Sequence, residues 1–163
     1  MTEIVLYSII LYRKEGENLL EETNGGFLIS QIKRVQGRIF QKLLNQAGIE
    51  EFNGAQGRIL YVLWQKDSIP IVELSKKTGL AKTTLTSMLD RLEKAKLVCR
   101  NYDIKDRRKI KITLTEKAKM LNDEYNRVSM QMNEIFYKNF TDNEIIQFEM
   151  LLNKVLKNLI ERE

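Results

Sequence analysis

The sequence predicts a mainly α-helical fold with a small β-hairpin wing, that is, a winged helix-turn-helix combined with a helical dimerisation region. Three observations predict it. Apolar residues recur every three or four positions over most of the 163 residues, whereas the stretch after Lys96 alternates with a period of two. Only one proline and eight glycines interrupt the chain, so the helices should be closely joined. With 43% hydrophobic residues, the chain can bury a core of its own.

The first two helices are expected between residues 27 and 64. In the first helix, apolar residues recur at helical spacing from Phe27 to Leu44, and Gly48 lies in the turn that follows. Asn53 offers a side-chain cap for the second helix, which continues to Trp64.

A helix-turn-helix is expected over residues 70–96. Because proline is accepted only in the first turn of a helix, a short helix should start near Pro70, continue to Thr78 and stop at Gly79. A second helix, near residues 82–96, has an apolar stripe that should face inward. This stripe consists of Leu85, Met88, Leu89 and Leu92.

A β-hairpin should follow the helix-turn-helix. Residues 97–102 and residues 110–114 alternate between apolar and polar side chains, and a charged, turn-like stretch separates the two runs. A hairpin in this position forms the wing of a winged helix-turn-helix domain.

Two more helices should complete the chain. Thr115 can cap the first of them, whose apolar residues from Ala118 to Ile135 step by three and four like a packing seam. The last helix opens with a complete capping box, in which Thr141 is followed three residues later by Glu144.

Positive charge is concentrated in one segment of the chain. The net charge is +5, but between Lys76 and Lys111 there are twelve Lys or Arg against four acidic residues, a local balance of +8. A confined basic patch is expected of a surface that neutralises phosphates. On charge alone, a solvated lysine-rich face explains the pattern equally well.

The composition excludes several kinds of site. The sequence has no histidine and one cysteine, Cys99, so it lacks the usual zinc, haem and iron–sulfur ligand sets, an internal disulfide and an imidazole base. We therefore expect no metal and no cofactor. No apolar run reaches the roughly 20 residues that span a bilayer, and the run from Ile4 to Tyr12 lacks the flanks of a secretory signal. A cytoplasmic protein without a membrane partner is expected.

The first turns of the second helix in the helix-turn-helix carry short polar side chains suited to base edges and phosphates. The candidate DNA-binding residues of this helix are Lys82, Thr83, Thr84, Thr86, Ser87 and Arg91. The hairpin tip adds Lys105, Asp106, Arg107 and Arg108, of which the basic members can reach the neighbouring minor groove. A charged hairpin tip without DNA contact is the alternative interpretation.

These segments resemble the MarR family of winged-helix regulators. The most specific matches are residues 73–75, 79–86, 92–98, 103–108 and 112–115, within a resemblance that runs from about Phe27 to the C-terminus. The resemblance implies that Asp106 steadies the wing and that Arg108 enters the minor groove. It also implies that polar residues matching Lys82, Thr83, Thr84 and Ser87 contact DNA.

The same resemblance implies a dimer and a mode of regulation. The first helix and the last two helices would intertwine with those of a second copy. Family members are usually repressors, and a small molecule or oxidation often relieves their DNA binding.

Three positions depart from the family pattern. Ala81 stands where a serine commonly caps the recognition helix, and loss of such a cap costs roughly 1 kcal/mol. Lys96 replaces a common glycine before the first wing strand, and Ala118 replaces another after the wing.

The expected organisation has three parts. Residues 1–24 extend beyond the usual start of the family and have no assigned role. Residues 25–52 and 115–163 form a helical dimerisation region. Residues 53–114 form the winged helix-turn-helix DNA-binding domain.

Two groups of residues have alternative interpretations. Phe40, Tyr61, Trp64 and Tyr125 could line an effector pocket, although aromatic residues at helical spacing are more often core. Cys99 lies in the first wing strand, where a packing role is expected in place of redox sensing.

The predicted function is a sequence-specific regulator of transcription that binds double-stranded DNA, a repressor relieved by a small-molecule effector. It should bind a pseudo-palindromic operator as a homodimer. The alternative is a non-catalytic winged-helix module that binds proteins. An enzyme is not expected, because no catalytic constellation is visible.

Overall fold

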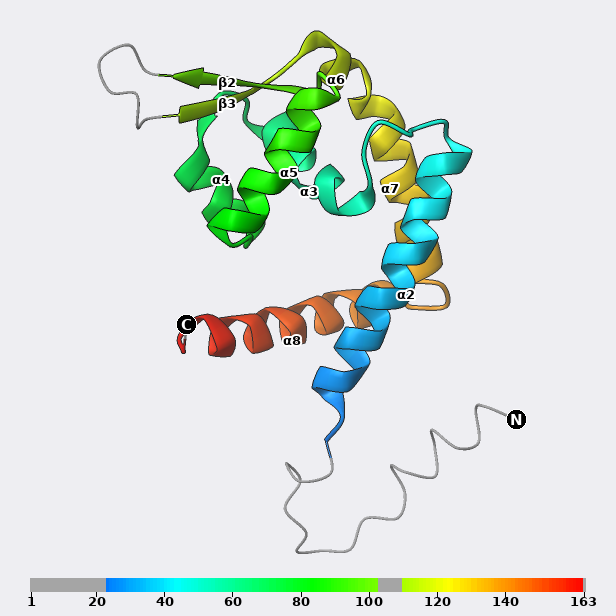
Figure 1. Ribbon diagram of the computed structural model, residues 1–163. Coiled ribbons are helices and arrows are strands. Elements are labelled where there is room, and N and C mark those ends of the chain that lie inside the picture. The colour runs from blue at the N-terminus through cyan, green and yellow to red at the C-terminus, as the bar shows by residue number, and fades with distance from the viewer. Residues whose placement is uncertain (1–22, 103–109, 163) are drawn as a thin grey trace, which may run out of the picture. The chain divides into compact units, whose positions relative to one another are not determined.

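The computed structural model describes residues 23–102 and 110–162, and helices carry most of them (Figure 1). The elements are α2 (Gly25–Gln46), α3 (Gly54–Gln65), β1 (Ile69–Pro70), α4 (Ile71–Thr78), α5 (Lys82–Lys94), β2 (Val98–Tyr102), β3 (Ile110–Leu114), α6 (Glu116–Met120), α7 (Asn122–Phe136) and α8 (Asp142–Ile160). The expected mainly helical fold with a small hairpin is therefore confirmed. Within the two described ranges, none of the helices has both the length and the apolar character that crossing a membrane requires.

The chain divides into two units, one ending at Val35 and the other beginning at Gln36, so the first half of α2 belongs to the first unit. In this half, large apolar side chains are exposed to solvent. They are Phe27, Leu28, Ile29, Ile32 and Val35.

Side-chain caps fix the starts of two helices in the second unit. Asn53 accepts a 2.9 Å hydrogen bond from the backbone N–H of Gln56, and the Gln56 side chain accepts one from the backbone N–H of Asn53. Thr141 and Glu144 form the same reciprocal arrangement at the start of α8. Both expected caps are confirmed, because each depends only on residues three apart.

The helix-turn-helix has the expected ends, with one correction. Gly79 ends α4 in the left-handed conformation, with a φ of 63°. Pro70, however, is not in the first turn of α4: it precedes the helix and ends strand β1. Its backbone is extended, with a ψ of 141°, and it lies opposite Lys111 of β3.

The sheet consequently has three strands instead of the expected two, in the order β1-β3-β2. β2 and β3 are antiparallel, with Val98 opposite Leu114 and Tyr102 opposite Ile110. In Figure 1 they form the long pair of arrows beside α5.

The prediction of one continuous helix after Thr115 is wrong. Thr115 does cap a helix, since its hydroxyl accepts a hydrogen bond from the backbone N–H of Ala118. That helix, α6, ends at Met120, and α7 starts at Asn122. At the break, the N–H of Leu121 bonds to the carbonyl of Ala118, three residues back, which tightens the last turn of α6.

The core lies between α3, α4, α5 and the sheet. The inward stripe of α5 is confirmed for its leucines, which are fully buried, whereas Met88 is half-buried and packs against them. The largest fully buried side chains include Leu60, Leu63, Leu74, Leu85, Leu89, Leu92, Leu97 and Ile112. These contacts hold α5 rigidly beneath its exposed face.

Candidate nucleic-acid interface

Helix α5 presents its polar residues to solvent. Lys82, Thr83, Thr84, Thr86 and Ser87 are all exposed. The hydroxyl of Thr86 donates a 2.9 Å hydrogen bond to the backbone carbonyl of Lys82. Across residues 23–102 and 110–162, no protein group pairs with the hydroxyls of Thr83, Thr84 and Ser87. Those three hydroxyls are therefore free to donate to and accept from a ligand.

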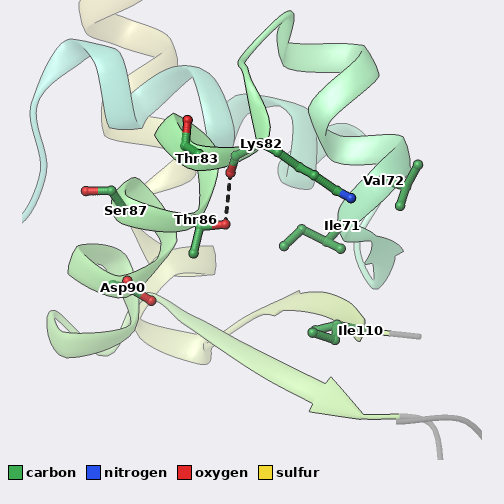
Figure 2. A pocket seen from close by; sticks show the side chains of 8 residues that line it. All are labelled: Ile71, Val72, Lys82, Thr83, Thr86, Ser87, Asp90 and Ile110. Carbon is green, nitrogen blue, oxygen red and sulfur yellow. Dashed lines mark hydrogen bonds between the residues drawn. The ribbon is translucent and has the colours of Figure 1, made fainter. Parts of the chain in front are cut away.

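A hollow of about 620 Å³ lies beside this face, between α5, the start of α4 and the start of β3. Figure 2 shows the Lys82 side chain extended across it toward Ile71 and Val72. One wall is thus apolar and the other carries hydroxyl groups. The lining residues are Ile71, Val72, Lys82, Thr83, Thr86, Ser87, Asp90 and Ile110.

Two hydroxyl groups form hydrogen bonds next to the turn before α5, one across the turn and one inside the end of α4. Ser75 donates a 2.9 Å hydrogen bond to the carbonyl of Leu80, and Thr78 donates a 2.7 Å bond to the carbonyl of Leu74. Sequence reasoning missed both bonds, although serine and threonine beside a turn glycine are a usable signal.

The first turn of α5 has no side-chain cap. Ala81 precedes the helix and makes no capping bond, as its departure from the family pattern predicts. The backbone N–H groups of a first turn have no partner inside the helix, so this end of α5 favours an anion such as a phosphate.

Arg100 is a polar residue of this region that sequence reasoning did not single out. Its guanidinium lies 2.6 Å from the carboxylate of Asp90 and also contacts that of Glu93. Burial lowers the pKa of Arg100, but the hydrogen bonds and charges of the two carboxylates outweigh burial and leave the pKa above its ordinary value. The available signal was a pair of acids three apart on the helix, followed by an arginine in the next strand.

The remaining DNA-binding candidates are only partly within the described residues. Arg91 is exposed on α5. Lys105, Asp106, Arg107 and Arg108 lie outside the described residues, so the expected wing contacts stay predictions. The strands that lead to them are paired side by side, and the Asn101 amide donates a 2.6 Å hydrogen bond to Thr113 across the pair.

Three of the four aromatic residues proposed for an effector pocket pack against one another. The ring centroids of Trp64 and Tyr125 are 4.9 Å apart, and those of Phe40 and Tyr125 are 5.7 Å apart. Phe52 contacts both Trp64 and Tyr125. Burial raises the pKa of the Tyr125 hydroxyl, which is a second sign that this ring belongs to the core. Tyr61, by contrast, is 48% exposed.

Cys99 does not have the packing role that its strand predicted. Its side chain is exposed, whereas those of its neighbour Val98 and of Leu114, opposite Val98, are buried. Alternation along β2 turns Cys99 to the outer face of the sheet.

Comparisons with known proteins agree with this geometry. The model of the MarR family matches residues 52–110. The chain is 33% identical to the uncharacterized HTH-type transcriptional regulator YsmB of Bacillus subtilis, over 78% of this chain and 83% of the relative. It is 31% identical to the homoprotocatechuate degradative operon repressor of Escherichia coli, over 62% of this chain and 68% of that repressor.

Two solved structures are similar over nearly their whole length. A MarR transcriptional regulator from Methanosarcina mazei Go1 has a TM-score of 0.74 and 25% identity, and covers 85% of this chain and 97% of its own. A mutant of E. coli MarR in complex with operator DNA has a TM-score of 0.75 and 27% identity, and covers 86% of this chain and 99% of its own.

Proposed function

Because the chain belongs to the MarR family of transcriptional regulators, we propose that it is a sequence-specific DNA-binding repressor that acts as a homodimer and is released by a small molecule. One observation carries the proposal. The free hydroxyls of Thr83, Thr84 and Ser87 stand on a helix whose opposite side is anchored by buried leucines. Such a rigid, polar helix face can read base edges in a major groove.

Each reading element has its own role in this proposal. The α5 residues Thr84 and Ser87 contact bases, while Lys82 and Arg91 neutralise phosphates. The wing, with Lys105, Arg107 and Arg108, reaches the neighbouring minor groove, and Asp106 steadies it. Residues 53–114 would thus form the DNA-binding domain.

The exposed apolar surface of α8 supports the homodimer. Its exposed large side chains are Ile146, Met150, Leu151, Val155, Leu156, Leu159 and Ile160. A monomer rarely leaves so many large apolar side chains of one helix in water, and a second copy is the commonest partner. Two copies related by a two-fold axis would read a pseudo-palindromic operator.

We place the small-molecule site around Tyr61. Phe40 and Trp64 are partly buried and each packs against the ring of Tyr125, which is buried, so little of this cluster is open to a ligand. Tyr61 keeps an exposed ring on the same helix as Trp64. A ligand there would touch α3, the helix that contacts α4 and β3.

No catalytic step is part of the proposal. The chain contains no histidine, and among the described residues no group of His, Cys, Asp and Glu could hold a metal ion.

The test is to recover and sequence the genomic DNA fragments that the purified full-length protein retains. One shared, two-fold symmetric motif is expected. A variant with Thr83, Thr84 and Ser87 all changed to Ala should lose the motif, whereas Ser30→Ala, an exposed helical serine on α2, should keep it. Retention of no DNA, with capture of a protein instead, would favour the winged-helix interaction module.

A further inference from the structure

We infer that Arg100 is a positioning residue that locks the recognition helix α5 to wing strand β2, so that the spacing between the two DNA-reading elements is fixed. This inference rests on the proposed function. Arg100 would not contact DNA itself but would fix the position of α5 relative to the wing.

One guanidinium contacts residues spread over about two turns of α5. Nη2 of Arg100 lies 2.6 Å from Oδ1 of Asp90 and 3.4 Å from the backbone carbonyl oxygen of Thr86, while Nη1 bonds to the carboxylate of Glu93. At 1.5 Å per residue, these partners span roughly 10 Å of helix axis. A contact over that length resists both sliding and tilting of α5 against the strand.

The backbone of Arg100 is held by the same helix. β2 is an edge strand, and Arg100 lies opposite Ile112 of β3. The N–H of Arg100 donates a 3.2 Å hydrogen bond to Oε1 of Glu93. Glu93 therefore binds both the side chain and the backbone of one strand residue, and it occupies an edge N–H that is otherwise unpaired.

The geometry also separates Arg100 from the other cations of the basic patch. Its side chain is only 14% exposed, whereas those of Asp90 and Glu93 are 52% and 40% exposed. The guanidinium is directed at the helix and is shared between two carboxylates. It is thus not available to a phosphate, although Arg100 is one of the residues counted in the local charge balance of +8 between Lys76 and Lys111.

A fixed spacing has a specific consequence for DNA recognition. α5 and the hairpin must reach two neighbouring grooves of one duplex. One inserted base pair moves the second site by about 3.4 Å along the axis. If α5 and the wing are held at a fixed spacing, they cannot both reach their sites after the insertion. If the connection between them is flexible, they can.

The experiment uses the full-length protein and the genomic fragment recovered above, with and without one base pair inserted between the bases read by α5 and those read by the wing. The wild type should lose about tenfold or more in affinity on insertion, a penalty of the size of a mismatched base pair. Arg100→Met should bind the native fragment more weakly and lose less than about threefold on insertion. Its dependence on salt should stay that of the wild type, because no phosphate contact is removed.

Two further variants test whether the effect of Arg100→Met comes from a folding defect or from a general change in charge. Asp90→Asn combined with Glu93→Gln weakens the same contacts from the helix side and should relax the spacing in the same way. Lys94→Met removes an exposed cation from α5 that has no ion pair within the described residues, and it should keep the wild-type penalty. Circular dichroism and the dimer mass should be unchanged in all three.

The outcomes separate the inference from the function. If the wild type binds its fragment and Arg100→Met keeps the full insertion penalty, Arg100 does not set the spacing. If Arg100→Met lowers the salt dependence by about one ion per subunit, Arg100 is a phosphate contact and the inference is wrong. If the wild type retains no DNA sequence at all, the proposed function fails, and the inference with it.

Discussion

The indole N–H of Trp64 donates a 2.9 Å hydrogen bond to the carbonyl oxygen of Ala118, so α3 of the winged domain is tied directly to α6. Fifty-four residues separate the two partners. The bond occupies a carbonyl beside the break between α6 and α7, in a residue whose side chain is fully buried.

Trp64→Phe should therefore destabilise the protein. The change keeps an aromatic ring but removes the indole donor from the Ala118 carbonyl, which then keeps the longer bond from the N–H of Leu121, and the loss of one hydrogen bond costs about 0.5–1.5 kcal/mol. Urea denaturation monitored by circular dichroism measures the change in the free energy of unfolding. Tyr61→Phe, which alters an exposed ring on the same helix, should shift the free energy of unfolding by less than about 0.5 kcal/mol. Equal effects of the two changes would contradict the role given to this bond.

Gly57→Ala should destabilise the protein through the aromatic cluster. A Cβ at Gly57 would lie 2.8 Å from the Tyr125 ring and 3.3 Å from Phe52, both of which are buried. Overpacking of this kind costs about 1–3 kcal/mol. Gly37→Ala in α2 is the matched control, because nothing lies within 4 Å of its Cβ. There the higher helix propensity of alanine should raise the melting temperature.

Lys96→Gly should stabilise the fold. Lys96 has a φ of 59°, a left-handed conformation that glycine adopts without strain and that costs other residues roughly 1–2 kcal/mol. Part of that gain is offset by the greater freedom of glycine in the unfolded chain. The β-branched change Lys96→Val should destabilise. In thermal unfolding, the melting temperature should be highest for the Gly variant, intermediate for the wild type and lowest for the Val variant. A Val variant as stable as the wild type would show that the backbone at Lys96 is not strained.

Glu144→Gln should change the dependence of stability on pH. The backbone N–H and hydroxyl of Thr141 hold the pKa of Glu144 below its ordinary value of 4.5. A lowered pKa in the folded state stabilises the protein above the unfolded pKa, and this contribution is lost as the pH falls through the folded value. The stability difference between wild type and variant should be constant from pH 7 to about pH 5 and shrink below it. Glu134→Gln, at an exposed position outside any cap, serves as the control.

Recognition helix and wing should differ in what they contribute to DNA binding. Thr84→Ala and Ser87→Ala should alter preference among operator variants, because each removes a hydroxyl that we propose contacts a base edge, and a good contact of this kind contributes about 1–3 kcal/mol of discrimination. Arg108→Ala should weaken binding to most sequences and lower the salt slope by about one per subunit. Titrations against operator and scrambled DNA at several salt concentrations distinguish the two. The proposed placement on DNA would be contradicted if Arg108→Ala left the affinity and the salt slope unchanged and if Thr84→Ala and Ser87→Ala left the sequence preference intact.

Features that depend on neighbouring residues could be predicted from the sequence. The caps at Asn53 and Thr141, the stop at Gly79 and the exposed hydroxyls of α5 all follow from residues within one or two helical turns. The change to a period of two after Lys96 predicted the wing hairpin, and the resemblance to a family added the intertwined dimer.

Features that depend on distant partners could not be predicted. Pro70 became a strand residue because β3 pairs with it, 41 residues later along the chain in the antiparallel register with Lys111. The break at Leu121 has no glycine or proline to mark it. The partners of Arg100 lie across a change from helix to strand, where periodicity carries no information about side-chain direction.

The exposed apolar residues of α8 also bear on how long two subunits stay together. Ile146 and Met150 project from one side of the helix, and Leu151 and Val155 from another, so no single flat surface can cover them all. A partner must surround the helix, and separation of the subunits then requires much of that packing to open at once. Mixed dimers of wild-type and mutant chains, once formed during synthesis, should therefore exchange subunits slowly, and a defective chain would disable its partner for the lifetime of the pair.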